Sequence, residues 1–239
     1  KLLHGNTAGA LAEKYEKFAL EWADVITVSS KEMLDYYKEK EYDVEFIPNA
    51  LDIEGLPTGE DRRFEKQIIY AARLSKEKGI IDILEMSKNL PKDIHLIILG
   101  DGPEITKVKK IESTISNVHY FGPKSKEETI RLVRGSDILI QPSLMEGGIS
   151  YTLLESLICK TPVICTPVGG GKEFFNHMEN CFLVKPGNVN DILAGIIQLF
   201  DDSKFYEKLC KFGYDSVQKF SWSQIGPEYI KIYEELLLK

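Results

Sequence analysis

Two glycine-rich loops lie within one stretch of the chain, from Gln141 to Glu173, and each leads into a helical pattern. The first loop contains Gly147 and Gly148, and the second contains Gly169 to Gly171. A glycine loop that enters a helix N-terminus presents backbone N–H groups to an anion, and the helix dipole adds to the attraction. The repeated arrangement favours a phosphorylated ligand. It also fits two tight turns of an ordinary α/β sheet, and the glycines alone leave both interpretations open.

Charged side chains accompany these loops. Glu146 and Glu155 bracket the first loop and the helix after it, and Arg73 and Lys78 follow an earlier apolar run. Taken singly, each has an ordinary explanation: solvated loop cations, an exposed loop acid, and a glutamate near a helix start. Taken together, they are candidate ligand-binding groups if the fold brings them to one place.

The elements that must position these residues alternate regularly between strand and helix. Continuous apolar runs predict strands at residues 68–72, 95–99, 118–121, 138–141 and 181–184, with helical patterns between and after them. Buried strands that each lead into a helix indicate a parallel sheet covered on both faces. Ligands of such sheets bind beyond the carboxyl ends of the strands, where Arg73, Lys78, Lys124 and both glycine loops fall.

The first fifty residues form a smaller strand–helix–strand pattern that cannot close a core of its own. A helix is predicted over 7–22, strands over 25–28 and 44–47, and a helix capped by Ser29 and Glu32 between those strands. Gly55, Pro57 and Gly59 mark residues 51–66 as a linker. We therefore predict four parts: 1–50, the linker 51–66, a main domain over 67–222, and a final helix over 223–239.

Composition limits the possible partners. The net charge of −7 argues against an extended nucleic-acid surface. The four cysteines have no metal-binding spacing, and we expect reduced core thiols in a cytoplasmic protein with no metal and no cofactor. No apolar run reaches the length of about 18 residues that a membrane span needs. The sequence begins with Lys1, and we expect it to be part of a longer chain.

Six segments resemble the donor-binding half of glycosyltransferase family 4, a retaining group with the GT-B fold. They are IIYAARLSKEKG, LIILGDGPE, VHYFGPKSKEE, SDILIQPSLMEGG, LLESLICKTPVICTPVGGGKE and FSWSQIGPEYIKIYEELL. Upstream, ADVITVSS and FIPNALDIE resemble the end of that family's first domain. The resemblance implies an α/β, Rossmann-like parallel sheet flanked by helices, with an incomplete second Rossmann-like domain from residues 1–50. The final helix is then expected to pack back on that N-terminal part.

The resemblance also implies a role for individual residues. Arg73 and Lys78 match the basic pair that holds the donor pyrophosphate, whose charge grows as the glycosidic bond breaks. Glu155 matches the carboxylate that accepts the ribose hydroxyls, and Glu146 matches the carboxylate beside the transferred sugar.

The remaining assignments follow in the same way. Gly147, Gly148, Ser150 and Tyr151 correspond to the loop that offers backbone N–H groups to the phosphates, and Lys124 to the loop beside the nucleobase. His4 corresponds to a catalytic histidine that faces the sugar from the first domain, although a turn histidine at the chain start explains it equally well. Eight residues separate Glu146 from Glu155, one more than is usual in the family, so the contacts of Glu146 and of the loop amides stay open.

The expected function is transfer of a sugar from a nucleoside diphosphate sugar to a carbohydrate or lipid-linked acceptor, with retention of configuration. The alternative is a nucleotide-sugar-binding module or subunit that needs a partner or the rest of the first domain. A GT-B epimerase fits less well, because the paired glutamates and the GGGKE segment indicate transfer. Donor base, sugar, acceptor and oligomeric state stay open, as does peripheral membrane contact through the absent part.

Overall fold

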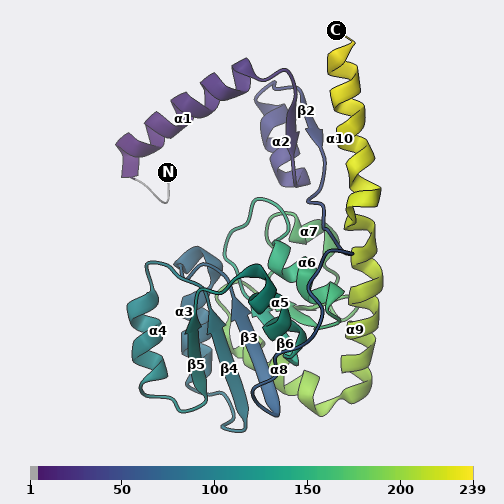
Figure 1. Ribbon diagram of the computed structural model, residues 1–239. Helices are drawn as coiled ribbons and strands as arrows, with labels where there is room; N and C mark the ends of the chain where they lie inside the picture. Colours follow the sequence, from purple (N-terminus) through teal and green to yellow (C-terminus); the bar gives the residue numbers. More distant parts are fainter. Residues whose placement is uncertain (1–4, 239) are drawn as a thin grey trace.

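The computed structural model describes residues 5–238 and shows a large α/β unit below a small N-terminal unit, with a long C-terminal helix beside both (Figure 1). The N-terminal unit comprises α1 (Gly5–Trp22), β1 (Ile26–Val28), α2 (Lys31–Glu39) and β2 (Val44–Phe46). The large unit comprises β3 (Lys66–Ala71), η1 (Lys76–Lys78), α3 (Ile80–Ser87), β4 (Ile94–Leu99), α4 (Ile105–Glu112), β5 (Val118–Gly122), α5 (Lys126–Arg134), β6 (Ile138–Gln141), α6 (Tyr151–Ile158), β7 (Val163–Cys165), α7 (Gly171–Phe174), β8 (Phe182–Leu183), α8 (Val189–Asp201), α9 (Ser203–Val217) and η2 (Gln218–Phe220). The closing helix is α10 (Trp222–Leu237).

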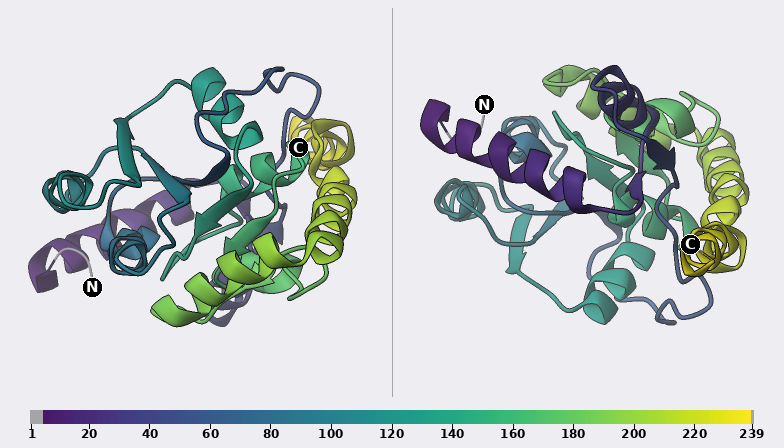
Figure 2. Two further views of the ribbon diagram at one scale, coloured as in Figure 1. Left: turned by 90° about the horizontal axis from the view of Figure 1, so that it is seen from below. Right: turned by 90° about the horizontal axis from the view of Figure 1, so that it is seen from above.

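The large unit is built on one parallel sheet of six strands in the order β5-β4-β3-β6-β7-β8. Helices α3, α4 and α8 pack on one face of the sheet, α5 and α6 pack on the other, and α9 contributes to both cores. Figure 2 shows the helices on the two sides of the sheet. Every residue of β6 is buried, which explains the uninterrupted apolar runs in the sequence. The predicted α/β fold is confirmed.

Side-chain caps fix two of the helix starts. At α5, the Ser125 hydroxyl accepts a hydrogen bond from the Glu128 N–H while the Glu128 carboxylate accepts from the Ser125 N–H, as the sequence predicts. At α2 the prediction is wrong by one residue. The cap is Ser30, whose hydroxyl accepts from the Met33 N–H, whereas Ser29 faces a glycine of the large unit.

The N-terminal unit contains a two-stranded parallel sheet, β1-β2, with α2 as the crossover. Helix α10 packs against this unit: Ile225 and Ile232 form a small buried cluster with Ile47 and Ala50. The apolar stripe of α10 therefore serves the N-terminal unit rather than the large sheet. Among residues 5–238, no helix is both long and apolar enough to cross a membrane.

The segment over 51–66, predicted as a linker, lies against the large unit along much of its length. Leu51 and Leu56 are buried in the core on the α5 and α6 side. Phe64 stacks on the rings of His95 and His119, with ring centroids 4.1 Å and 4.3 Å away. These apolar side chains anchor a segment whose glycines and proline suggest a loose connection.

Candidate functional site

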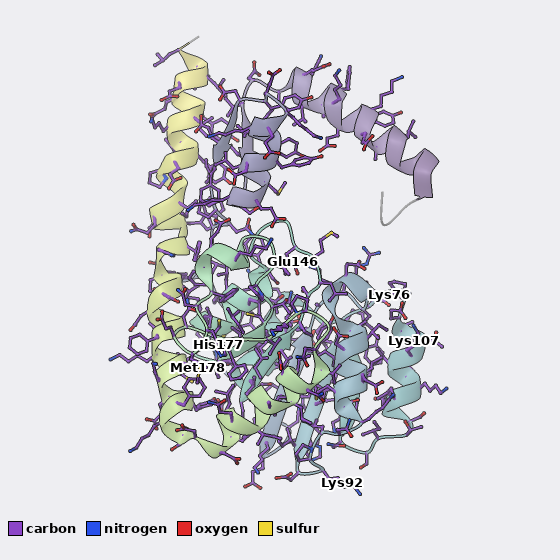
Figure 3. All side chains as sticks on the ribbon, turned by 180° about the vertical axis from the view of Figure 1, so that it is seen from behind. Lys76, Lys92, Lys107, Glu146, His177 and Met178 are labelled. Carbon is purple, nitrogen blue, oxygen red and sulfur yellow. The ribbon has the colours of Figure 1, made fainter. Side chains whose placement is uncertain are left out.

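The candidate residues gather where the sheet changes direction. From β3 the chain builds outward through β4 to β5, then returns to the other side of β3 with β6, β7 and β8. The loops after β3 and β6 therefore start from adjacent strands at the carboxyl edge, which is the place where parallel α/β sheets bind ligands. In Figure 3, Glu146 lies at the end of the large unit that faces the N-terminal unit, and Lys92 lies at the opposite end.

An ion pair joins the two loops. The Lys78 Nζ atom lies 2.6 Å from both carboxylate oxygens of Glu146, and the two side chains are only 27% and 12% exposed. The sequence assigned these residues to different parts of a ligand, and the structure makes them one unit. An ammonium group has three N–H donors, so a Lys78 that donates to both oxygens of Glu146 has one N–H left for an anion.

Glycine allows the two loops to meet. Gly79, directly after η1, has a left-handed φ of 74°, and a Cβ atom there would lie 2.1 Å from the Pro142 carbonyl oxygen. The Tyr70 hydroxyl lies 3.1 Å from the carbonyl oxygens of both Arg73 and Lys78, which fixes the ends of the loop after β3. Only glycine at position 79 permits the close contact with the Pro142 carbonyl.

Two buried polar residues that the sequence analysis did not select, Gln141 and Ser143, support Glu146. Its Oε1 atom accepts hydrogen bonds from the Ser143 hydroxyl (2.8 Å) and from the Gln141 amide Nε2 (3.2 Å). The Gln141 amide oxygen in turn accepts from the Ser150 hydroxyl at 3.0 Å. A glutamine that ends a fully apolar strand was the available signal, because a buried amide must find partners.

Arg73 offers a second cation beside this pair. Its side chain is exposed, and no carboxylate within residues 5–238 forms an ion pair with it. The guanidinium is therefore free to bind an anion in a bidentate manner.

The start of α6 is prepared in a complementary way. Ser150 is the N-cap residue, yet its side chain makes no capping hydrogen bond, because the hydroxyl is directed to Gln141 instead. The first N–H groups of α6, from Tyr151 onward, thus have no side-chain cap. Gly148 in the preceding loop packs closely on the N-terminal unit: a Cβ atom there would lie 2.6 Å from the Ser29 hydroxyl. This arrangement suits an anion at the helix N-terminus.

Glu155 lies one turn into α6 with its side chain 13% exposed. Burial raises the pKa of the Glu155 carboxyl, and the Lys126 ammonium, 3.5 Å away, partly opposes that shift. A mostly buried carboxylate with one weak partner retains acceptor capacity for a diol.

Two predicted residues stand apart from this group. The Lys124 ammonium lies 3.6 Å from the Glu128 carboxylate, and it is Lys126, two residues on, that reaches Glu155. His4 lies outside the described residues, so its predicted role stays a prediction. Within the described chain, no group of three or more His, Cys, Asp or Glu side chains is arranged to hold a metal ion.

The N-terminal unit touches both glycine loops. The Asn49 side-chain amide donates to the Ile149 carbonyl oxygen at 2.7 Å, next to Gly148 in the first loop. The Glu173 carboxylate, in α7 directly after the second loop, accepts from the Lys31 backbone N–H at 2.7 Å, at the start of α2. The site thus lies at the junction of the two units.

Comparison with known sequences identifies the family. The sequence model of the glycosyl transferases group 1 family matches residues 60–216, which is more than half of the chain and includes every candidate residue except His4. The chain belongs to this family. Five of the six segments that resemble the donor-binding half of family 4 fall within this match, and the sixth, which starts at Phe220, follows it.

Curated relatives agree with this family and are longer than the chain. An uncharacterized glycosyltransferase of Methanocaldococcus jannaschii, MJ1069, is 27% identical over 92% of the chain and 61% of its own length. The N-acetyl-alpha-D-glucosaminyl L-malate synthase of Bacillus anthracis is 24% identical over 92% of the chain and 62% of its own length. The chain therefore spans about three fifths of the length of these relatives.

Solved structures show the same fold. HepE of Anabaena, crystallised with UDP-glucose, superposes with a TM-score of 0.81 at 17% identity, over 92% of the chain and 66% of HepE. The chain thus has an α/β fold of the GT-B type, with a parallel sheet flanked by helices and a partial second domain.

Proposed function

We propose that this group 1 glycosyltransferase chain binds a nucleoside diphosphate sugar at the carboxyl edge of its six-stranded sheet. The observation that carries the proposal is the Lys78–Glu146 pair, with an unpaired Arg73 and the uncapped start of α6 beside it. Cations and helix N–H groups suit the diphosphate, and carboxylates suit the hydroxyls of sugar and ribose.

In this proposal each residue has a defined part. Arg73, the third N–H of Lys78 and the amides at Gly148, Ser150 and Tyr151 bind the diphosphate. They also stabilise the charge that grows on it when the glycosidic bond breaks, which is the main source of catalysis that these residues can supply. Lys124 lies beside the nucleobase.

The carboxylates hold the rest of the donor. Glu155 accepts from the ribose hydroxyls, and Glu146 accepts from the transferred hexose. Membership of family 4 and retention of configuration belong to the same proposal, and the resemblance of the six segments to that family supports them. His4 would complete the site from the N-terminal side.

A second candidate is a nucleotide-sugar-binding module that needs more of the first domain for transfer. The described N-terminal unit has two strands, and the relatives carry further chain. The acceptor, carbohydrate or lipid-linked, would then bind mainly outside the residues described.

The test is a thermal-shift panel of UDP, GDP, UDP-glucose, UDP-N-acetylglucosamine and GDP-mannose, followed by calorimetry of the nucleotide that stabilises the chain most. We expect one base to be preferred and Arg73→Ala to reduce the thermal shift. Binding should persist in EDTA, because cationic side chains can neutralise the diphosphate. Absence of binding across the panel would reject the proposal, and affinity that EDTA removes and Mg²⁺ restores would reject its metal-independent form.

A further inference from the structure

We propose that Gln141 is a positioning residue for donor recognition: its side-chain amide fixes the carboxylate of Glu146 and thereby sets how well the sugar is bound relative to the diphosphate. This inference rests on the proposed function, because it assigns Glu146 to the sugar. Gln141 is the last residue of β6, next to β3 and β7 at the centre of the sheet, and it is only 1% exposed.

The orientation of the Gln141 amide is determined by its neighbours. The Nε2 atom lies 3.2 Å from Glu146 Oε1, to which it donates, and 3.3 Å from the Ser143 hydroxyl. On the other side, the amide oxygen accepts from the Ser150 hydroxyl. The opposite orientation would place the amide oxygen against the Glu146 carboxylate, which is unfavourable, so the network selects one arrangement.

This arrangement makes the two oxygens of Glu146 different. Oε1 receives hydrogen bonds from Lys78, Gln141 and Ser143, so its acceptor capacity is used. Oε2 receives only the Lys78 ammonium among the described residues. Oε2 is therefore the atom that can accept a hydroxyl group of a ligand.

Gln141 itself is out of reach of a ligand. The void beside it, bordered by Ser143, Glu146, Ser150 and Thr166, has a volume of about 10 Å³, which is about the space of one water molecule. Gln141 must therefore act through Glu146.

The same amide also affects α6. Because the Ser150 hydroxyl donates to Gln141, it does not cap the helix, and the first N–H groups of α6 stay available. Loss of the amide would release Ser150 to cap its own helix and would free Glu146 to turn. The Gln141 side chain thus affects both the Glu146 carboxylate, which is assigned to the sugar, and the N–H groups at the start of α6, which are assigned to the diphosphate.

The experiment compares Gln141→Met, which preserves side-chain volume and removes the hydrogen bonds, with Gln67→Met. Gln67 is a matched control, because it is also a fully buried glutamine of the central sheet, and its amide donates to the Ser136 hydroxyl. It lies near the start of β3, at the edge of the sheet opposite to the site. Calorimetry measures the affinity for UDP-glucose and for UDP, or for GDP-mannose and GDP if the wild type prefers guanine. The readout is the affinity for the sugar nucleotide divided by the affinity for the nucleoside diphosphate.

We expect Gln141→Met to lower that ratio at least tenfold, by weakening the sugar nucleotide more than the diphosphate, and Gln67→Met to leave it unchanged. Ser150→Ala, which keeps the Gln141 side chain and removes one restraint on it, should lower the ratio in the same direction by a smaller factor. This variant decides the matter if Gln141→Met does not fold. An unchanged ratio in a folded Gln141→Met, or in Ser150→Ala if the first does not fold, would overturn the inference. If the wild type binds no member of either pair, the proposed function itself fails, and the inference fails with it.

Discussion

At the scale of single residues, the main result is that Lys78 and Glu146 neutralise each other. The pair is mostly withdrawn from water, and Ser143 and Gln141 provide further hydrogen bonds to the carboxylate. A buried ion pair becomes a liability when one partner is removed, because the other charge stays behind without compensation. The two cations of the site should therefore respond differently to substitution.

Arg73→Ala should weaken nucleotide binding by about 1.5–3 kcal/mol, the scale of a charged hydrogen bond. The free energy of unfolding of the Arg73→Ala variant should stay nearly unchanged, because the Arg73 side chain is exposed. Lys78→Ala should weaken binding to a similar degree and also lower the free energy of unfolding by about 2–4 kcal/mol, because Glu146 is left unpaired. Calorimetry and urea unfolding measure the two effects.

The control is the double variant Lys78→Met with Glu146→Gln. It should recover stability without recovering binding, since both charges are gone. Equal unfolding free energies for the Arg73 and Lys78 single variants would contradict this account of the pair.

The buried carboxyl of Glu155 should make the free energy of unfolding depend on pH. Because burial raises its pKa above the ordinary value of 4.5, the folded protein holds this proton to higher pH than the unfolded chain does. The free energy of unfolding must then fall as the pH rises through the window between 4.5 and the raised folded pKa. Glu155→Gln should therefore gain stability relative to the wild type as the pH rises from 4 to 8.

The measurement is urea unfolding of both proteins at several pH values. In the same variant, the preference for a nucleotide over its 2′,3′-dideoxy analogue should be lost. A stability difference that is independent of pH would show that Glu155 is not destabilised by burial. A retained preference for the ribose hydroxyls would remove its role in binding the ribose.

At the scale of elements, the site depends on the loop after β3 touching the loop after β6. Gly79 permits that contact, and the Leu144 N–H donates to the Glu77 carbonyl oxygen at 2.7 Å to hold it. The short helix η1 that carries Lys78 is thus positioned by backbone contacts between the loops that follow two neighbouring strands.

Gly79→Ala should destabilise the fold by about 3 kcal/mol or more, because it combines a left-handed backbone with a severe clash against Pro142. Gly187→Ala is the matched control. Gly187 has nearly the same φ, 76° against 74°, but nothing lies within 4 Å of the position of its Cβ atom. Its substitution should cost about 1–2 kcal/mol, from backbone strain alone. Thermal unfolding of both variants checks the difference, and similar losses of stability would mean that the contact with Pro142 can relax.

At the scale of the whole molecule, the described part of the N-terminal unit is small, with two strands and two helices. Helix α1 extends away from the body (Figure 2) and exposes an apolar stripe of Leu11, Tyr15, Phe18 and Trp22. An exposed apolar stripe of this kind is typical of a surface that contacts other protein. Glycosyl transfer needs closure around both substrates.

We therefore expect the 239-residue chain to bind a donor but to transfer sugar at least about 10²-fold more slowly than a protein of the length of its relatives, because the acceptor is not held in place. The measurement is release of nucleoside diphosphate in the presence of candidate acceptors. The Bacillus anthracis malate synthase, assayed with its own substrates, is the control for the assay. Rapid turnover by the chain alone would contradict this expectation.

The fold class and most of the candidate residues could be predicted from the order of residues along the chain. Unbroken apolar strands that alternate with helices permit only a parallel sheet covered on both faces, and ligand groups in such a sheet follow the strands. Arg73, Lys78 and Glu146 could be selected for that reason, and the resemblance to family 4 added Glu155. Ser125 and Glu128 could be recognised as a cap because a capping box is a local pattern.

The arrangement of these residues in space depends on contacts between distant parts of the chain. Strand order depends on which helices and strands pack together, so the adjacency of β3 and β6, and with it the Lys78–Glu146 pair, could not be obtained from spacing. Ser29 was mistaken for the cap of α2 because its true neighbour, Gly148, lies more than a hundred residues away. Gln141 was overlooked for the same physical reason: the partners that give a buried amide its purpose come from loops that meet only in three dimensions.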